Sequence, residues 1–282
     1  MEMLNRNRPL TTVMLPLLAA VAFSIGTDAS ARAGAKVYVG QKVDSSISMD
    51  AVDHSAWTSL LKKFVNPLGR VDYRGWKSSA GDIRSLDAYL ATLSTASLTQ
   101  KSSKNATLAF WINAYNAVTV RGILREYPTT SIRNHTAKLF GYNIWKDLLL
   151  HVGGSTVSLD AIEHQKLRPM GDPRIHFAIV CASIGCPRLL DEAYEADRLD
   201  GQLDEAARGF FSLSMNLRYD DRSNAFELSS IMDWFGQDFG DGDSAVLKRI
   251  APWIPSGPAK DSATRGTSSI RYMNYDWSLN EQ

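Results

Sequence analysis

Two cysteines and a histidine lie close together in the sequence. Cys181 and Cys186 are the only cysteines in the 282 residues, and His176 lies just before them. A thiolate activated by a neighbouring imidazole is the working unit of cysteine hydrolases and acyltransferases. Glu163 and Asn113 supply a carboxylate and an amide that could orient the imidazole. These residue types predict a catalytic group of Cys181, His176, Glu163 and Asn113.

The spacing of these residues leaves their arrangement open. On a regular strand the side chains of His176 and Cys181 point to opposite faces, because their separation is an odd number of residues. They meet only if the chain turns after Val180, or Cys186 folds back through the segment 183–185. A disulfide between the cysteines is the structural alternative, although so small a loop adds little stability. A nucleophilic thiol, a packed thiol and a disulfide therefore all remain open.

Two amides stand one helical turn apart in an otherwise apolar segment, at Asn113 and Asn116. A buried amide without a partner costs about 1 to 3 kcal/mol, so both must be hydrogen-bonded to other elements. We expect their partners in the loop of Glu163 or in the segment of His176. Tying a helix to a loop would explain both amides without catalysis. The residues predicted to bind a ligand are Asn116, Tyr115, His164, Cys186 and Arg174.

Histidine and cysteine also bind metals, but their spacing here does not favour a metal site. A zinc site would combine His151, His164 or His176 with a cysteine. The sequence has neither a Cys-x-x-Cys nor a His-x-x-x-His pattern to support it. We therefore predict no metal site and no cofactor.

Hydrophobic periodicity predicts the elements that must position these residues. Helices are predicted over 53–64, 83–93, 107–127, 199–211 and 231–239, and strands over 157–159, 175–180, 226–230 and 270–275. Pro128 ends the longest helix, and Asp160 is predicted as the N-cap of a helix that carries Glu163. The sequence therefore predicts an α+β fold, in which a helix-rich first half packs on a small, mostly antiparallel sheet.

The N-terminus has the three parts of a secretory signal peptide. Arg6 and Arg8 precede an apolar run over 11–25, and the small residues at 29–31 and 33–35 fit a cleavage site. The run is too short to span a membrane comfortably, because a spanning helix needs about 20 apolar residues. We predict a signal peptide over 1–31, a flexible arm over 32–52 and one globular domain over 53–282. The mature protein is expected to be periplasmic or secreted, with no integral membrane segment after cleavage.

The charges of the chain nearly cancel. The sequence has 31 basic and 30 acidic residues spread along its length, and its formal net charge is +1. Such a chain has no strong field to attract nucleic acid or an anionic membrane surface. We therefore expect the partner to be a small molecule, a peptide or a protein, and not nucleic acid.

Four ordered motifs resemble one known family. They lie at 110–116, 158–164, 172–187 and 275–280 and read FWINAYN, SLDAIEH, DPRIHFAIVCASIGCP and YDWSLN. From about Trp57 to the C-terminus the chain resembles the domain-of-unknown-function 547 family, although Ala182 stands where the family usually has glycine. Relatives occur as exported bacterial proteins and as parts of larger plant and animal proteins, and no activity is generally assigned to them. The resemblance therefore implies little biochemistry.

The order of a core helix followed by a histidine strand also resembles papain-like and transglutaminase-like proteins. Those folds place a nucleophilic cysteine at the N-terminus of the core helix, where this chain has Asn113. A papain-like fold would therefore have lost or moved its nucleophile.

Two functions follow from these residues. The first is an exported binding or scaffold domain with a polar pocket centred on His176 and the cysteines. The alternative is a thiol-dependent hydrolase or acyltransferase that acts on a peptide or small amide, with Cys181 or Cys186 as nucleophile and His176 as base. Free thiols favour the enzyme, whereas a disulfide favours the scaffold.

Overall fold

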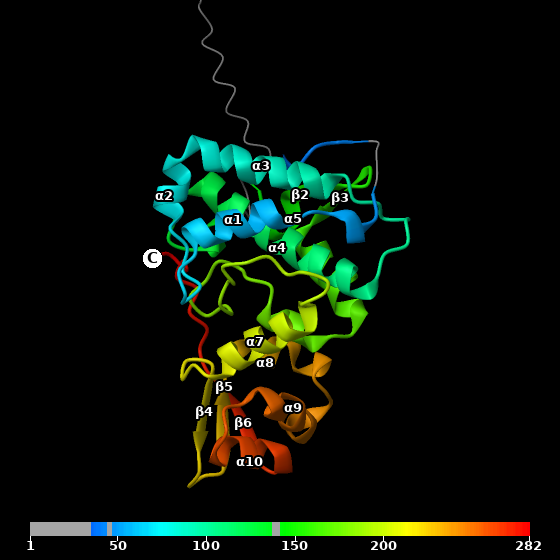
Figure 1. Cartoon of the computed structure of the whole chain (residues 1–282). Coiled ribbons are helices and arrows are strands. Elements are labelled where there is room, and N and C mark those ends of the chain that lie inside the picture. Colours follow the sequence, from blue (N-terminus) through cyan, green and yellow to red (C-terminus); the bar gives the residue numbers. More distant parts are fainter. Residues whose placement is uncertain (1–34, 44–46, 137–141) are drawn as a thin grey trace, which may run out of the picture. The chain divides into compact units, whose positions relative to one another are not determined.

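The structure is a computed structural model of the chain, and it describes residues 35–43, 47–136 and 142–282 (Figure 1). All described residues belong to one compact unit, within Ala31–Gln282. The predicted signal peptide over 1–31 lies outside the described residues. The segment predicted as a flexible arm contains a strand, β1 Val37–Val39, and a 3₁₀ turn, Met49–Ala51.

The predicted fold class, α+β, is confirmed. The α-helices are α1 Ser55–Phe64, α2 Tyr73–Ser78, α3 Ala80–Ser94, α4 Lys104–Glu126, α5 Ile144–Asp147, α6 Leu159–Ala161, α7 Leu199–Phe211, α8 Ser230–Phe235, α9 Gly242–Ile250 and α10 Pro258–Arg265. The strands are β1 Val37–Val39, β2 Leu148–Val152, β3 Ser155–Ser158, β4 Leu217–Asp220, β5 Ala225–Leu228 and β6 Ser269–Tyr272.

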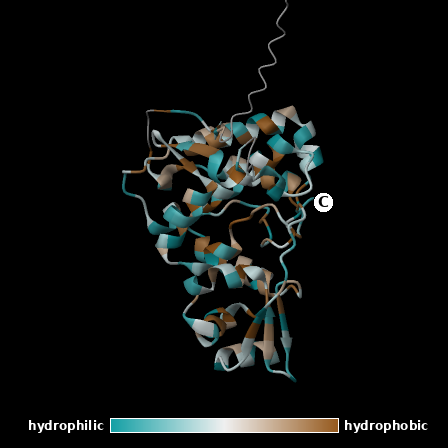
Figure 2. Cartoon of the chain, turned by 180° about the vertical axis from the view of Figure 1, so that it is seen from behind, coloured by the Kyte–Doolittle hydropathy of each residue, from teal (hydrophilic) through white to brown (hydrophobic). Residues whose placement is uncertain are grey.

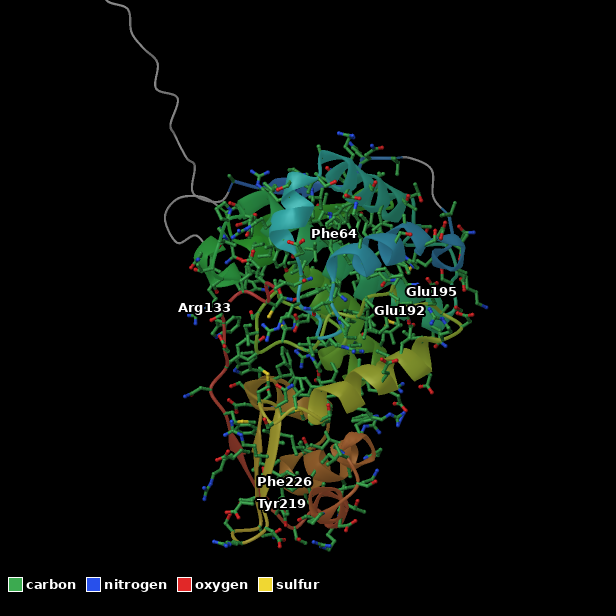
Figure 3. All side chains as sticks on the ribbon, turned by 60° about the vertical axis from the view of Figure 1, so that its left-hand side comes forward. Phe64, Arg133, Glu192, Glu195, Tyr219 and Phe226 are labelled. Atoms are coloured by element: carbon green, nitrogen blue, oxygen red, sulfur yellow. The ribbon has the colours of Figure 1, made fainter. Side chains whose placement is uncertain are left out.

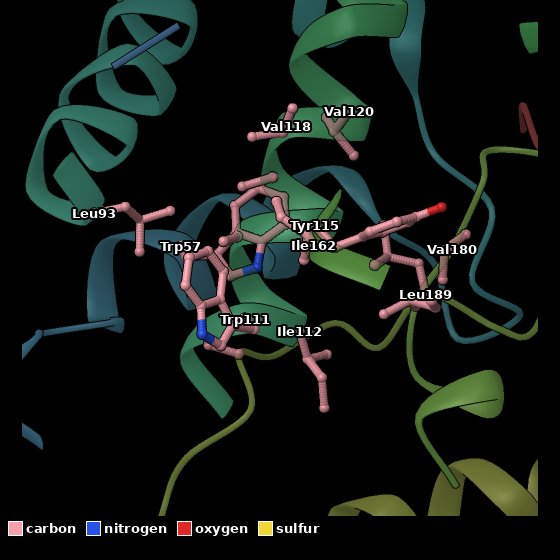
Figure 4. Packing of buried hydrophobic residues seen from close by; sticks show 14 of the residues in the cluster. Trp57, Leu93, Trp111, Ile112, Tyr115, Val118, Val120, Ile162, Val180 and Leu189 are labelled. Atoms are coloured by element: carbon pink, nitrogen blue, oxygen red, sulfur yellow. The ribbon is translucent and has the colours of Figure 1, made fainter. Parts of the chain in front are cut away.

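The long helix α4 forms the centre of the larger hydrophobic core. The Ser103 hydroxyl caps its first turn by accepting a hydrogen bond from the backbone N–H of Ala106. Most of its residues are buried, which is typical of a helix surrounded by other elements. The helices α2 and α3 and the strand β2 contact it. In Figure 4, Trp111 and Tyr115 of α4 lie among the buried side chains of this core, which also include Trp57 of α1.

The strands form two small mixed sheets among the described residues, rather than the single, mostly antiparallel sheet that we predicted. In the first sheet β2 pairs with β1 in parallel and with β3 antiparallel, and Leu150 lies opposite Val157. In the second sheet β5 pairs antiparallel with β4 and in parallel with β6. Tyr219 of β4 and Phe226 of β5 are paired on neighbouring strands of the second sheet, and their ring centroids lie 4.7 Å apart (Figure 3).

A second hydrophobic core lies between this sheet and the later helices. It contains Phe210 and Phe211 of α7, Phe226 of β5 and Leu247 of α9, with Phe177 in contact with both phenylalanines of α7. Brown and teal segments alternate along the helices in Figure 2, as expected when one face of a helix packs on a core and the other meets solvent. None of the helices in the described part of the chain is both long and apolar enough to cross a membrane.

The apolar run over 175–180, which we predicted as a strand, begins instead as a 3₁₀ helix over Pro173–Phe177. The Asp172 carboxylate accepts a hydrogen bond from the backbone N–H of Arg174, and Pro173 fixes a helical φ at the first position. These local signals outweigh the apolar composition of the run. The expectation that alternate residues of this segment face opposite ways is therefore wrong.

Candidate functional site

A cavity of about 250 Å³ gathers side chains from segments that are far apart in the sequence. Its lining comes from α4, from α5 to α6 and the turn after it, from the cysteine loop, from α8 and from the C-terminal segment. The lining residues are Tyr115, Trp145, Asp160, Glu163, His164, His176, Ile179, Cys181, Cys186, Pro187, Ile231, Trp234, Phe235, Tyr275 and Trp277. The cavity contains six of the nine residues that sequence analysis proposed for the site.

The two cysteines are free thiols that face each other across a tight turn. The backbone N–H of Cys181 donates a hydrogen bond to Sγ of Cys186 at 2.9 Å, and the backbone N–H of Cys186 bonds to the carbonyl of Ser183 at 3.2 Å. The hydroxyl of Tyr275 lies 3.2 Å from Sγ of Cys181 and 3.0 Å from Sγ of Cys186. Ala182, between them, adopts a φ of 58°, a left-handed conformation that glycine adopts more readily.

These contacts make the two thiols unequal. The hydrogen bond from Cys186, followed by those from the hydroxyls of Ser183 and Tyr275, lowers the pKa of Cys181 despite its burial. Burial, and then the hydrogen bond to Cys181, raises the pKa of Cys186 well above its ordinary value. Cys181 is therefore the thiol that ionises first.

His176 lies at the cavity wall, but it is bonded to a carboxylate and not to a thiol. Its Nε2 lies 2.7 Å from Oδ2 of Asp238, and its ring stacks on Phe235 at 4.2 Å between centroids. The side chain of Arg168 donates hydrogen bonds to both oxygens of the same carboxylate, at 2.7 and 2.8 Å. Among the hydrogen bonds of the described residues, none joins this imidazole to Cys181 or Cys186. The predicted thiol–imidazole pair is thus absent as a hydrogen-bonded unit in this part of the chain.

The ionisation states of Asp238 and His176 follow from the same contacts. Hydrogen bonds from Arg168 and then from His176 lower the pKa of Asp238 to about 2. The carboxylate therefore accepts, and Nε2 of His176 carries the hydrogen. Burial lowers the pKa of His176, although Asp238 opposes the shift. The imidazole is consequently held neutral and fixed in one tautomer.

Glu163 and His164 lie on a π-helix, Ile162–Leu167, that follows α6. The N-cap of α6 is Ser158, whose hydroxyl accepts from the N–H of Ala161, and not Asp160 as predicted. Single π-helical turns are frequent at functional sites. Here the wide turn carries Glu163, whose carboxylate accepts a hydrogen bond from the hydroxyl of Tyr115 at 3.3 Å. Burial raises the pKa of Glu163.

Aromatic side chains form one wall of the cavity. The ring of Trp234 stacks on Trp277 at 5.6 Å, and Tyr275 lies 4.5 Å from Trp277 and 4.9 Å from Trp234. Trp145 meets Trp277 edge to face at 6.4 Å. Trp234 is 45 % exposed, which is unusual for so large an apolar residue. The wall therefore presents apolar ring surface to anything that enters the cavity.

Each of the two amides of α4 donates one hydrogen bond to the backbone of another segment and accepts one from it. The side chain of Asn113 donates to the carbonyl of Tyr194 at 2.8 Å and accepts from its N–H at 2.9 Å. Asn116 likewise donates to the carbonyl of Ala178 at 3.0 Å and accepts from the N–H of Val180 at 2.9 Å. Neither residue lines the cavity. The catalytic role predicted for Asn113 and the binding role predicted for Asn116 have no counterpart in these contacts, which position loops.

Arg174 also lies away from the cavity. Its guanidinium pairs with three carboxylates, at 2.7 Å from Asp172, 2.7 Å from Asp200 and 2.9 Å from Asp204. These pairs join the 3₁₀ helix over Pro173–Phe177 to α7. These contacts are structural, and the ligand contact of Arg174 stays a prediction.

Sequence reasoning missed Asp238, Tyr275 and the tryptophans of the wall. The segment 275–280 was part of a recognised motif, but its residue types gave no reason to place it beside the cysteines. In the described ranges no group of three or more His, Cys, Asp or Glu side chains is arranged to hold a metal ion.

These observations define an α+β protein with a cavity that is lined by thiols and aromatic rings. Residues 99–211 match a family model described as "Protein of unknown function, DUF547", and this match supports the family resemblance of the motifs. The match contains Tyr115, Glu163, His176 and both cysteines, whereas Trp234, Tyr275 and Trp277 lie beyond it. No curated protein and no solved structure matches the chain.

Proposed function

We propose that the chain is a binding domain for a small molecule or the end of a peptide, with the His176- and cysteine-lined cavity as its site. The observation that carries this proposal is the convergence of five separate segments on one cavity of about 250 Å³. Ligand sites typically combine apolar and aromatic walls with a few polar groups that fix orientation. This cavity has both components, and its volume suits a ligand of about ten heavy atoms rather than a large cofactor.

The charge of the lining favours a cationic ligand. Asp160 and Glu163 line the cavity, and neither has an ion-pair partner among the described residues. Arg168, which follows the π-helical turn directly, is bonded to Asp238. A ligand ammonium group would supply the missing partner for Glu163, as a charge-assisted hydrogen bond.

The aromatic wall favours the same class of ligand. The faces of tryptophan and tyrosine rings attract cations within about 6 Å of the ring centroid. Arg133 already lies over Trp277 at 5.2 Å, while Trp234 and Tyr275 also line the cavity. An arylalkylamine could stack its ring on this wall and direct its ammonium group towards Glu163.

Tyramine is a suitable probe, and its binding can be followed by the tryptophan fluorescence of the purified chain at about pH 8, where Glu163 is more fully ionised. We expect a saturable change in emission with tyramine. The matched acid, 3-(4-hydroxyphenyl)propionate, has the same ring with the opposite charge and should bind about tenfold or more weakly.

Substitution of Glu163 tests whether tyramine binds in the cavity beside its carboxylate. Glu163→Gln should weaken tyramine binding by about tenfold or more, because a hydrogen bond to a charged group contributes about 1.5 to 3 kcal/mol. Glu205→Gln is the matched control, since Glu205 is exposed on α7 and, within the part of the chain that the structure describes, forms an ion pair with Arg188 alone. Equal affinity for amine and acid, or equal weakening by both substitutions, would contradict the proposal.

A thiol-dependent hydrolase or acyltransferase is the second candidate, and the lowered pKa of Cys181 at the cavity favours it. Its predicted base, His176, is only 3 % exposed and is bonded to Asp238. We therefore expect His176→Ala to leave the rate of Cys181 alkylation by iodoacetamide unchanged near neutral pH. Slower alkylation in that variant would favour the enzyme over the binding domain.

We further propose that the protein works in the periplasm or outside the cell. The basic start, apolar run and small residues of the first 35 positions support this localisation. Fractionation of cells that express the full chain, followed by measurement of the intact mass in each fraction, tests it.

A further inference from the structure

We propose that Cys181 and Cys186 form a reversible dithiol–disulfide couple that exchanges with low-molecular-weight disulfides at the cavity. The turn between them already brings the sulfur of Cys186 to 2.9 Å from the backbone nitrogen of Cys181. Because the Cα of Cys181 is bonded to that nitrogen, rotation about the Cα–Cβ bonds can bring the sulfurs together. The pair also shares one hydroxyl, that of Tyr275, as a hydrogen-bond partner.

The contacts of the pair assign a separate role to each thiol. The hydroxyl oxygens of Ser183 and Tyr275 lie 3.5 and 3.2 Å from Sγ of Cys181, and hydrogen bonding with Cys186 and with these groups lowers the pKa of Cys181. Cys186 retains its proton, because burial and the neighbouring Cys181 both disfavour its ionisation. An exchange couple needs this asymmetry, with one thiolate that attacks and a second thiol that resolves the mixed disulfide.

The surroundings favour exchange over acyl transfer. The second thiol occupies the position beside Cys181 where a hydrolase would need its general base, and the imidazole of His176 is bonded to Asp238 instead. Both cysteines line the cavity, so a disulfide that enters it can reach them. The close packing of Gly185 against Tyr275 keeps the loop and the hydroxyl together, since a Cβ on residue 185 would lie 2.9 Å from the tyrosine ring.

The exchange balances in two steps. The thiolate of Cys181 attacks one sulfur of a disulfide RSSR, the S–S bond breaks, and RS⁻ leaves and takes a proton from solvent. Cys186 then loses its proton and attacks Sγ of Cys181, which breaks the mixed disulfide and releases the second RSH. Two protein thiols are oxidised to one disulfide, and RSSR is reduced to two RSH. A dithiol reductant reverses both steps.

The test mixes the reduced full chain with oxidised glutathione in the absence of oxygen. Samples are quenched with acid, their remaining free thiols are alkylated with N-ethylmaleimide, and the intact mass is measured. The wild type should form the internal disulfide, with little mixed glutathione adduct at any time. Cys186→Ser should instead accumulate one adduct on Cys181 that a dithiol removes. Cys181→Ser should form its adduct about tenfold or more slowly, because Cys186 is the less ionised thiol.

Circular dichroism and the thermal midpoint establish that each serine variant is folded, and Cys186→Ala replaces Cys186→Ser if the latter is not. A stable adduct in place of the internal disulfide of the wild type would overturn the proposal. Thiols of the wild type that react with oxidised glutathione only after unfolding in urea would overturn it equally. No amine is present in this experiment, so its outcome is independent of the proposed ligand.

Discussion

Replacing Asn116 with alanine removes the side chain that holds the segment leading to Cys181. In the native chain its amide pairs with the carbonyl of Ala178 and the N–H of Val180, which are residues only 1 % and 3 % exposed. The substitution leaves both backbone groups buried without these partners. Each such group costs about 1 to 3 kcal/mol, so we expect a loss of about 2 to 6 kcal/mol in the free energy of unfolding.

Urea unfolding of the reduced chain, followed by tryptophan fluorescence and by far-ultraviolet circular dichroism, measures this loss. A loss of this size is a large part of the 5 to 15 kcal/mol typical of a folded domain, so the midpoint should shift clearly. Asn105→Ala on the same helix is the matched control, because Asn105 is exposed and makes one hydrogen bond, to the carbonyl of Ala196 at 3.2 Å. It should change stability by about 0.5 kcal/mol or less. A loss for Asn116→Ala no larger than that of the control would refute the positioning role.

Three further predictions concern acid stability, the thiols and the N-terminus. Burial lowers the pKa of His54 from 6.5 to about 4. Between these pH values the unfolded chain binds a proton that the folded chain does not, so the free energy of unfolding should fall by about 3 kcal/mol as the pH falls from 6.5 to about 4. His54→Asn should flatten that part of the plot of urea midpoint against pH, and an unchanged slope would assign the acid sensitivity to other groups. Tyr275→Phe should raise the pKa of Cys181 and move its alkylation profile to higher pH, whereas an unmoved profile would show that the hydroxyl does not act on the thiol. The exported chain should have the mass of a protein that starts after residue 31 or 35, and a mass that still includes residues 1–25 would contradict cleavage.

The helices were predictable because their apolar residues recur with a helical period. Thus 199–211 matches α7 at both ends, and 107–127 differs from α4 only near its ends. The run over 175–180 was not predictable from composition, because Asp172 and Pro173 start a 3₁₀ helix that overrides its strand-like residues. The pairing of β1 with β2 was also missed, since it joins segments about a hundred residues apart.

The reactive half of the site was predictable, because thiols, imidazoles and carboxylates are recognisable by type. Cys181, Cys186, His176 and Glu163 all line the cavity. The other half was not, because Tyr275 and the tryptophans of the wall acquire a role only through tertiary contacts with distant segments. The hydrogen bond of His176 to Asp238 was missed for the same reason, since Asp238 lies far along the chain.

Protection of Cys181 by tyramine tests most directly whether the ligand and the thiols share one cavity. The rate of Cys181 alkylation by iodoacetamide is measured in the reduced Cys186→Ser variant over a range of tyramine concentrations, with 3-(4-hydroxyphenyl)propionate as the matched control. A bound amine covers the cavity, so the rate should fall as tyramine saturates the tryptophan fluorescence change, and the acid should leave it unaltered at equal concentration. A rate that stays constant while tyramine saturates the fluorescence would place the amine elsewhere and contradict the account.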